Sequence, residues 1–184
     1  MQNVRMSAIV LMILGAAATR LLPHPYNFTC ITALALFGGA HFSDRRLAFA
    51  VPLLALVLSN VALGWVWSLS SLAYASHSWV QYASFALVVP MGLSLRGRTT
   101  LLRTAGTTLA ASTMFYLVSN FGVWLFDAMY AKSLAGLVEC YVAAIPFFGN
   151  ALAGDAFYTG LLFGGIHLLE SRFASLREPQ PLGA

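Results

Sequence analysis

The sequence predicts an all-α membrane protein with six transmembrane helices and a short interfacial helix between the fifth and sixth spans. Of its 184 residues, 59% are hydrophobic and 9% are charged, whereas about a quarter of the residues in a soluble domain are charged. The mean hydropathy is +0.78, and the apolar residues form long runs separated by short charged loops. We expect one six-helix membrane domain over residues 1–173 and a disordered cytoplasmic tail over residues 174–184.

The first three spans are predicted over residues 6–22, 28–42 and 47–64. Pro23 ends the first span, because proline lacks an amide donor and disfavours helix in the residue before it. Asn27 or Thr29 could cap the second span, in which Gly38 and Gly39 favour close helix contact. The chain start also fits a cleaved signal peptide, but the apolar run extends beyond it, so we expect a retained helix.

The last three spans are predicted over residues 79–95, 104–126 and 150–170. Residues 65–79, which are rich in aromatic and hydroxyl side chains, suit a membrane interface. Residues 134–148 are apolar but shorter than the roughly 20 residues that a crossing needs. We therefore expect a separate helix on the outer leaflet that ends at Pro146 and Gly149. Gly160 and Gly164, one turn apart, favour tight packing of the last span.

The distribution of Lys and Arg predicts the orientation. With the amino terminus inside, the inner loops carry Arg5, Arg45, Arg46, Arg96, Arg98, Arg103, Arg172 and Arg177, and the outer side carries Arg20 and Lys132. This positive-inside bias predicts a multi-pass membrane protein with both termini cytoplasmic. It also explains the pI of about 9.4, so we expect a lipid bilayer and no nucleic acid as partner.

Polar side chains in and beside the spans gather at one depth, in the outer half of the membrane. Facing lipid would be costly for each of them, so we expect them to face one another or a bound small molecule. The candidate substrate-binding residues are Arg20, His24, Asn27, Asn60, His77, Tyr82, Asn120, Trp124, Asn150 and Asp155. Lys132 and Glu139 belong to the segment that we expect to form a lid. Neither the continuous polar lining of a channel nor the stepped carboxylates and histidines of a proton relay is found.

Each candidate also has a structural interpretation. Asp155 could lock helices together through an ion pair with Arg20 or Lys132, and Arg20 could extend to the outer headgroups. Asn60 and Asn120 could join helices through hydrogen bonds. Trp124 could anchor the chain at the interface, and lone loop histidines mostly have no special role. The sequence leaves these alternatives open.

No catalytic constellation is found in the sequence. It lacks a Gly-rich phosphate loop, a GxSxG elbow and an HExxH pair, and His167 is predicted on the opposite side of the membrane from the polar cluster. Cys30 and Cys140 allow at most one disulfide and form no metal-type pair. We expect a protein that is not an enzyme and has no intrinsic cofactor.

Four stretches resemble a bacterial membrane family of uncharacterised putative transport proteins: RLLPHPYNFTCITALALFGGAHF, RRLAFAVPLLALVLSN, NFGVWLFD and AGLVECYVAAIPFFGNALAGDAFYTGLLFGG. That family is similar in size and six-span plan to the substrate-binding S components of energy-coupling-factor vitamin transporters. In S components, outer loops close over a vitamin held in the outer half of the membrane. The resemblance therefore implies an S-component-like fold, with residues 22–28, 65–78 and 127–149 in the place of those loops.

The resemblance further implies uptake of a vitamin-like solute from the periplasm into the cytoplasm. Cobalamin is the leading candidate substrate, since some solitary proteins of this type take it up and its cobalt accepts a thiolate or imidazole, here from Cys30, His24 or His77. S components dock on a shared energy-coupling module through alanines one turn apart in span one. The first span here contains Gly15, Ala16, Ala17 and Ala18 but no clean Ala-xxx-Ala spacing. A solitary transporter of the bacterial inner membrane is therefore favoured, with an energy-coupling module as the alternative. The alternatives are a structural or assembly membrane protein and a membrane enzyme that modifies a bound lipid or cofactor.

Overall fold

The computed structural model describes residues 2–66 and 78–177. It is all-helical, with 83% helix and no strand in the described residues, as the composition predicts. The helices are α1 (Gln2–Ala18), α2 (Ile31–His41), α3 (Arg45–Val66), α5 (Ser78–Leu93), α6 (Leu101–Phe126) and α7 (Leu134–Arg172), with the 3-10 helices η1 (Thr19–Leu21) and η2 (Ala174–Leu176).

Four of the described helical segments are long and apolar enough to cross a membrane. They are Val4–Leu21, α3, α6 and α7. The helices α2 and α5 are also apolar, but they are shorter, at 11 and 16 residues. These helices indicate a membrane protein, whereas the number of spans and the S-component-like fold stay predictions.

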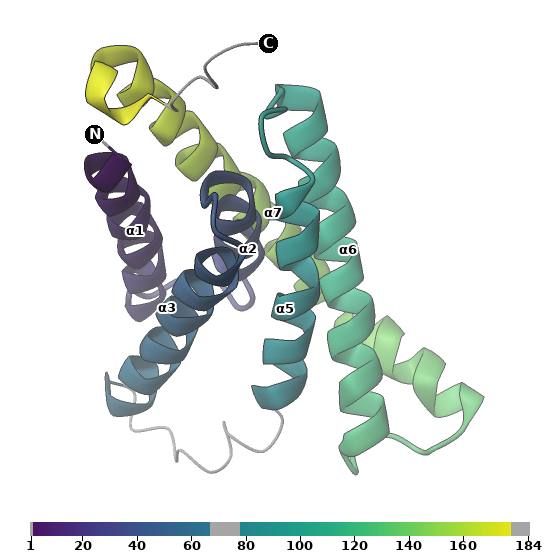
Figure 1. Ribbon diagram of the computed structural model, residues 1–184. Coiled ribbons are helices and arrows are strands. Elements are labelled where there is room, and N and C mark those ends of the chain that lie inside the picture. Colours follow the sequence, from purple (N-terminus) through teal and green to yellow (C-terminus); the bar gives the residue numbers. More distant parts are fainter. Residues whose placement is uncertain (1, 67–77, 178–184) are drawn as a thin grey trace.

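The short helix α2 forms the centre of the molecule. Figure 1 shows it between α1 and α3 on one side and α5, α6 and α7 on the other. All ten residues from Ile31 to Ala40 are buried. A helix that is apolar on every face can be covered in this way on every side, so the core is built around α2.

Glycines bring α2 close to its two neighbours, as the sequence predicts. A Cβ atom on Gly39 would lie 2.6 Å from the carbonyl oxygen of Val89 and 2.8 Å from the Cα of Gly92, both in α5. One on Gly38 would lie 2.3 Å from Cγ of Pro52 in α3. The backbones of α2 and α5 are therefore in direct contact.

The prediction of tight packing at Gly160 and Gly164 is wrong. Among the described residues, no atom outside the helix lies within 4 Å of a Cβ placed at either position. Both glycines instead border a cavity between α6 and α7. The four-residue spacing of small residues also occurs where a helix leaves space beside it.

The predicted cap of α2 is also wrong. The helix begins at Ile31 with Cys30 as its N-cap residue, and no side chain caps it. Asn27 has a left-handed φ of 62° in the preceding segment. This segment lies directly on α7, since a Cβ on Gly154 would be 2.8 Å from the backbone nitrogen of Thr29. Packing of the segment on α7 delays the start of α2.

The separate interfacial helix that we predicted is part of α7. This helix runs without a break through Pro146 and Gly149 for 39 residues. Proline removes one helical hydrogen bond, here to the carbonyl of Val142, and membrane helices tolerate that loss. The helix rises about 58 Å, nearly twice the roughly 30 Å of the hydrocarbon core. It passes obliquely behind α5 and α6 (Figure 1).

The first residues of the predicted tail are ordered. Ala174–Leu176 form η2, in which Leu176 is buried, and Nε of Arg177 donates to the carbonyl oxygen of Glu170 at 3.0 Å. The disorder predicted from residue 174 is therefore wrong for this part of the tail. Residues 178–184 lie outside the described residues.

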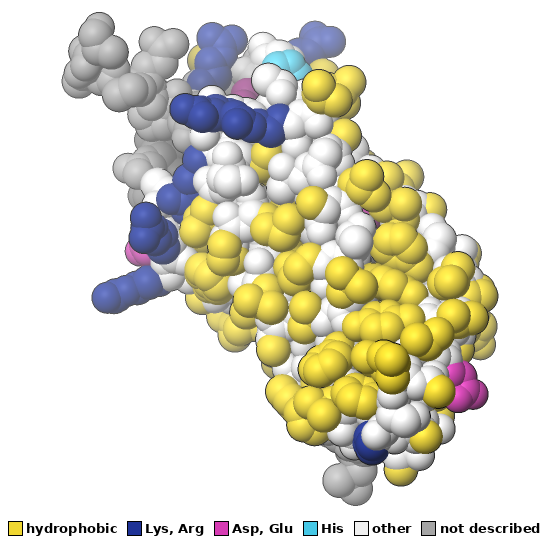
Figure 2. Space-filling model, turned by 90° about the vertical axis from the view of Figure 1, so that its right-hand side faces the viewer, with side chains coloured by type: hydrophobic (Ala, Val, Ile, Leu, Met, Phe, Trp, Pro, Cys, Tyr) yellow, Lys and Arg dark blue, Asp and Glu magenta, His cyan; other side chains and the backbone are white. Residues whose placement is uncertain are grey.

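Lys and Arg side chains gather at one end of the molecule. Figure 2 shows them around the end at which α1 starts and α7 finishes, with a broad hydrophobic surface over the rest of that face. Arg96 lies at this end and donates to the backbone carbonyls of Gly39, Phe42 and Ser43. The segregation follows the sequence pattern from which we predicted both termini to be cytoplasmic.

Candidate functional site

A polar cavity of about 250 Å³ lies among the segment before α2, α2 itself, α5, α6 and α7. We call it the Asp155 cavity. Its polar lining comes from Arg20, Asn27, Thr29, Thr32, Gln81, Ser112, Tyr116, Ser119, Asn120 and Asp155. Its walls therefore combine charges, amides and hydroxyls from helices that are otherwise apolar.

Two buried charged residues belong to this lining. Arg20 and Asp155 are each 4% exposed. The Nη1 of Arg20 donates to Oγ of Ser59 on α3, and Oδ2 of Asp155 accepts from Oγ of Ser112 on α6 at 2.7 Å. Thr32 at the start of α2 also faces this carboxyl group. A guanidinium and a carboxyl group are thus held at one cavity by side chains from α2, α3 and α6.

Aromatic rings form another part of the wall. Phe115 and Tyr116 come from α6, and Phe147 and Phe148 come from α7. The rings of Tyr116 and Phe148 lie 4.7 Å apart between centroids, and the Tyr116 hydroxyl donates to the carbonyl of Tyr141 at 2.6 Å. Such rings offer flat apolar surface beside the polar groups.

The structure brings four of the ten predicted binding residues together. Arg20, Asn27, Asn120 and Asp155 all line the Asp155 cavity. They come from η1, the segment before α2, α6 and α7, so up to 135 positions of sequence separate them (20 to 155). Asn120 also donates from Nδ2 to the carbonyl of Tyr116 within α6 at 2.8 Å.

Three further candidates form hydrogen bonds away from this cavity. Nδ2 of Asn60 on α3 donates to the hydroxyl of Tyr82 on α5 at 3.0 Å, which is the helix-joining role that the sequence left open for Asn60. Nε1 of Trp124 donates to the carbonyl of Ala131 at 2.9 Å, where the chain turns from α6 into α7.

Two of the remaining three candidates, His24 and Asn150, are exposed. The ring of His24 is exposed and contacts the carbonyl of Pro25 at 3.0 Å through Nδ1. Nδ2 of Asn150 donates to the carbonyl of Tyr26 at 3.1 Å and so joins α7 to the segment before α2. His77 lies outside the described residues.

The two residues predicted for the lid lie elsewhere. Nζ of Lys132 donates to the carbonyls of Trp124 and Asp127, which stabilises the C-terminal end of α6. Glu139 is exposed on α7. The predicted lid segment contributes Phe147 and Phe148 to the cavity wall instead.

The sequence reasoning missed the hydroxyl residues of the site. Ser112 contacts Asp155 directly, and Tyr116 belongs to the aromatic wall. One signal could have found them, because polar residues stand at every fourth position of α6: Thr104, Thr108, Ser112, Tyr116 and Asn120. Residues four apart are neighbours on a helix, and each such step turns about 40° further round it, so these side chains form a polar stripe that winds round α6.

Two of the three residues considered as cobalt ligands, Cys30 and His24, do not line this cavity. Cys30 is buried, and its Sγ donates to the carbonyl of Ala16 at 3.2 Å, away from the cavity lining. Within residues 2–66 and 78–177, no group of three or more His, Cys, Asp or Glu side chains could hold a metal ion.

A second, larger cavity of about 550 Å³ lies between α6 and α7 near the end that carries the Arg side chains. We call it the His167 cavity. Thr104, Thr108, Thr159 and His167 are among its lining residues, with Gly160 and Gly164 beside them.

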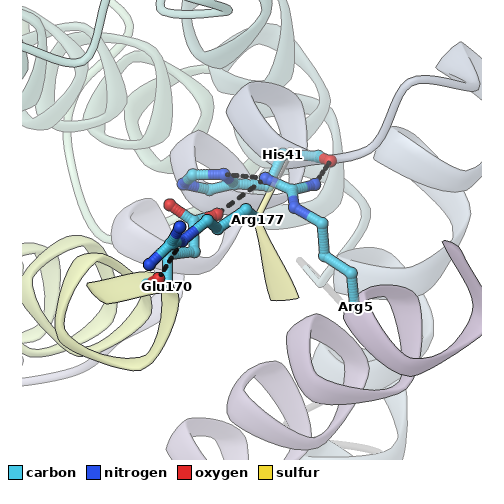
Figure 3. A network of polar contacts seen from close by, with 4 residues as sticks. All are labelled: Arg5, His41, Glu170 and Arg177. Atoms are coloured by element: carbon cyan, nitrogen blue, oxygen red, sulfur yellow. Dashed lines mark hydrogen bonds and ion pairs between the residues drawn. The ribbon is translucent and has the colours of Figure 1, made fainter. Parts of the chain in front are cut away.

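A polar cluster borders the His167 cavity through His41 and Glu170 (Figure 3). Arg5 of α1 donates from Nη1 to the carbonyl of His41 at 3.2 Å and forms an ion pair with Glu170 of α7 at 3.1 Å. Arg177 contacts the carbonyl of Glu170 from the other side. The cluster therefore joins α1, α2, α7 and the tail at one point.

Comparison with known proteins gives one match. The model of a family described as a family of unknown function (DUF6580) matches residues 1–177. No curated protein and no solved structure matches the chain.

Proposed function

Because the chain belongs to DUF6580, a family of unknown function, we propose its function from the Asp155 cavity. The protein binds a small, vitamin-like or amino-acid-like solute in this cavity from the periplasmic side and delivers it to the cytoplasm. The observation that carries the proposal is that Arg20 and Asp155 are both buried and line one cavity. Three amide side chains, Asn27, Gln81 and Asn120, line the same cavity from the segment before α2, from α5 and from α6.

The cost of burying these groups supports a binding role. A charged or amide side chain inside apolar surroundings loses its hydration, and that loss is offset only by specific partners. Here the partners leave room for about 250 Å³ of solute between them. Polar groups in membrane helices that face such a space are candidates for contact with a transported solute.

The lining also suggests the class of solute. Arg20 can pair with a carboxylate, Asp155 can pair with an ammonium or accept from another donor, and the aromatic wall suits a flat apolar group. A zwitterion with a ring fits these three features. Cobalamin stays in the set to be tested, although its corrin ring is large for a cavity of about 250 Å³.

Thermal unfolding of the purified protein tests the proposal. A panel of free amino acids, small water-soluble vitamins and cobalamin is added, and a bound compound stabilises the protein by about 2.7 kcal/mol at a hundred times its Kd. Asp155→Asn and Arg20→Gln should abolish this stabilisation. The matched control is Glu139→Gln, which alters an exposed carboxylate of α7 and should retain it.

Three results would refute the proposal. If no compound stabilises the protein and none co-purifies with it by mass spectrometry, the polar residues serve assembly of the helices alone. If a bound compound leaves chemically altered, the protein is a membrane enzyme. Stabilisation that persists in Asp155→Asn would place the binding site elsewhere in the molecule.

A further inference from the structure

The polar stripe of α6 extends from one cavity to the other. Ser112, Tyr116 and Asn120 line the Asp155 cavity, whereas Thr104 and Thr108 line the His167 cavity. Ser112 and Thr108 are adjacent members of the stripe, about 6 Å apart along the helix axis. The two cavities therefore approach each other within about one helical turn along the same helix.

The facing side of α7 is polar at the same level. Asp155 accepts a hydrogen bond from Ser112 at 2.7 Å. Thr159, one turn further along α7, accepts from the Thr108 hydroxyl at 3.3 Å. We call Thr104, Thr108, Ser112, Asp155 and Thr159 the polar seam. All five are buried.

The rest of the interface differs from the glycine contact between α2 and α5. On the α7 side of the His167 cavity, Gly160 and Gly164 leave space that no described atom fills within 4 Å. Two hydroxyl contacts, from Ser112 to Asp155 and from Thr108 to Thr159, cross the seam between the cavities. At this level side chains meet, whereas between α2 and α5 backbone lies against backbone.

We propose that the polar seam is the route along which a solute passes from the Asp155 cavity to the His167 cavity when α6 and α7 separate at Thr108 and Thr159. This inference rests on the proposed uptake function. The solute would then leave past His167 and the cluster of Arg5, His41 and Glu170, which borders the far end of the His167 cavity (Figure 3). This route differs from the expectation from sequence, in which the polar groups are confined to one half of the protein.

A purely structural role for the seam makes a different prediction. The hydroxyls of Thr108 and Ser112 can instead donate their single hydrogen to backbone carbonyls one turn back in α6, each at 2.9 Å, and such hydroxyls can serve only to hold helices together. In that case the seam stays closed and dry. Access of water to the Thr108 level from the Asp155 cavity therefore decides between the two roles.

Cysteine accessibility measures this directly. In a protein carrying Cys30→Ser and Cys140→Ser, the single variants T108C, S112C and T159C are reconstituted into phosphatidylethanolamine and phosphatidylglycerol vesicles. In vesicles of one orientation, they are then treated with a charged, membrane-impermeant methanethiosulfonate that is added only on the side of the Asp155 cavity, because Thr108 and Thr159 already line the His167 cavity. The reagent modifies the thiolate, which requires water at the site. The control is T113C, next to Ser112 but lining neither cavity.

We expect T108C, S112C and T159C to react at least about tenfold faster than T113C. Because the modification is irreversible, brief openings of the seam accumulate over time. If T108C and T159C stay as unreactive as T113C in protein that elutes as a single species, the route is overturned. Thr108 and Thr159 lie at the same level on the two facing helices. If one of the two variants fails to fold, the other still tests the route.

Ligand binding separates this outcome from failure of the proposed function. The same cysteine-substituted protein is tested for stabilisation by the panel of amino acids and vitamins. Retained stabilisation with unreactive seam cysteines overturns the route alone. Reactive seam cysteines without any stabilising compound support the route and count against the binding site.

Discussion

Replacing Gly39 by alanine should destabilise the protein, although alanine is the better helix former. The added Cβ would lie 2.6 Å from the carbonyl oxygen of Val89 and 2.8 Å from the Cα of Gly92. Both are backbone atoms, so no side chain can rotate away and α5 must shift. Overpacking of this kind costs about 1–3 kcal/mol, against a gain of about 0.5–1 kcal/mol for removing a helical glycine.

Gly106→Ala in α6 is the matched control. Among the described residues, no atom outside its own helix lies within 4 Å of a Cβ at that position, so this variant keeps the gain of about 0.5–1 kcal/mol without the clash. The two variants should therefore differ in stability by about 1–3 kcal/mol. For a chain of 184 residues this corresponds to a Tm lower by about 2–12 °C in Gly39→Ala than in Gly106→Ala.

Intrinsic fluorescence during heating in one detergent measures both variants. Gly92→Ala should show a comparable loss, because its Cβ would lie 2.5 Å from the carbonyl oxygen of Leu36 in α2. The double variant of Gly39 and Gly92 should lose less than the sum, since one shift of α5 relieves both clashes. A Gly39→Ala protein at least as stable as Gly106→Ala would refute the close contact of α2 and α5.

Two further predictions concern contacts away from the Asp155 cavity. Arg5→Gln should lower stability by about 1–3 kcal/mol, because Glu170 and the carbonyl of His41 lose their charged donor. Adding Glu170→Gln to this variant should lower stability little further. Tm losses of the two single variants that add fully in the double variant would contradict the pairing. Tyr82→Phe removes the acceptor of Asn60 and should cost about 0.6 kcal/mol, a mean value for such bonds between membrane helices. It should leave stabilisation by ligand unchanged, and loss of that response would assign Tyr82 to the binding site.

The helices were largely predictable because their ends carry strong local signals. A charged loop precedes each of the predicted spans 47–64 and 104–126, which correspond to α3 and α6. The continuity of α7 was not predictable, because Pro146 breaks helices in most soluble settings and is tolerated here inside the helix. The central position of α2 depends on its contacts with every other helix, which periodicity does not report.

The candidate site was predictable where the side chain is conspicuous in apolar sequence. Arg20, Asn120 and Asp155 are costly residues in such surroundings, and all three line the cavity. Ser112 and Thr108 were missed, because a hydroxyl can bond to its own helix and is ordinary in membrane helices. Only their four-residue spacing along α6 distinguishes them from other hydroxyl residues of the apolar helices.

The complete enclosure of α2 has a consequence for biosynthesis. Its 11 residues rise about 16 Å, roughly half of the 30 Å that an independently inserted helix must bridge. As the nascent chain leaves the ribosome, α2 is therefore too short to settle in lipid before its later neighbours are synthesised. We expect chains truncated before α5 to be degraded by membrane proteases. Release of the full-length protein from the insertion machinery should require that α5 is synthesised and that its Gly92 packs against α2.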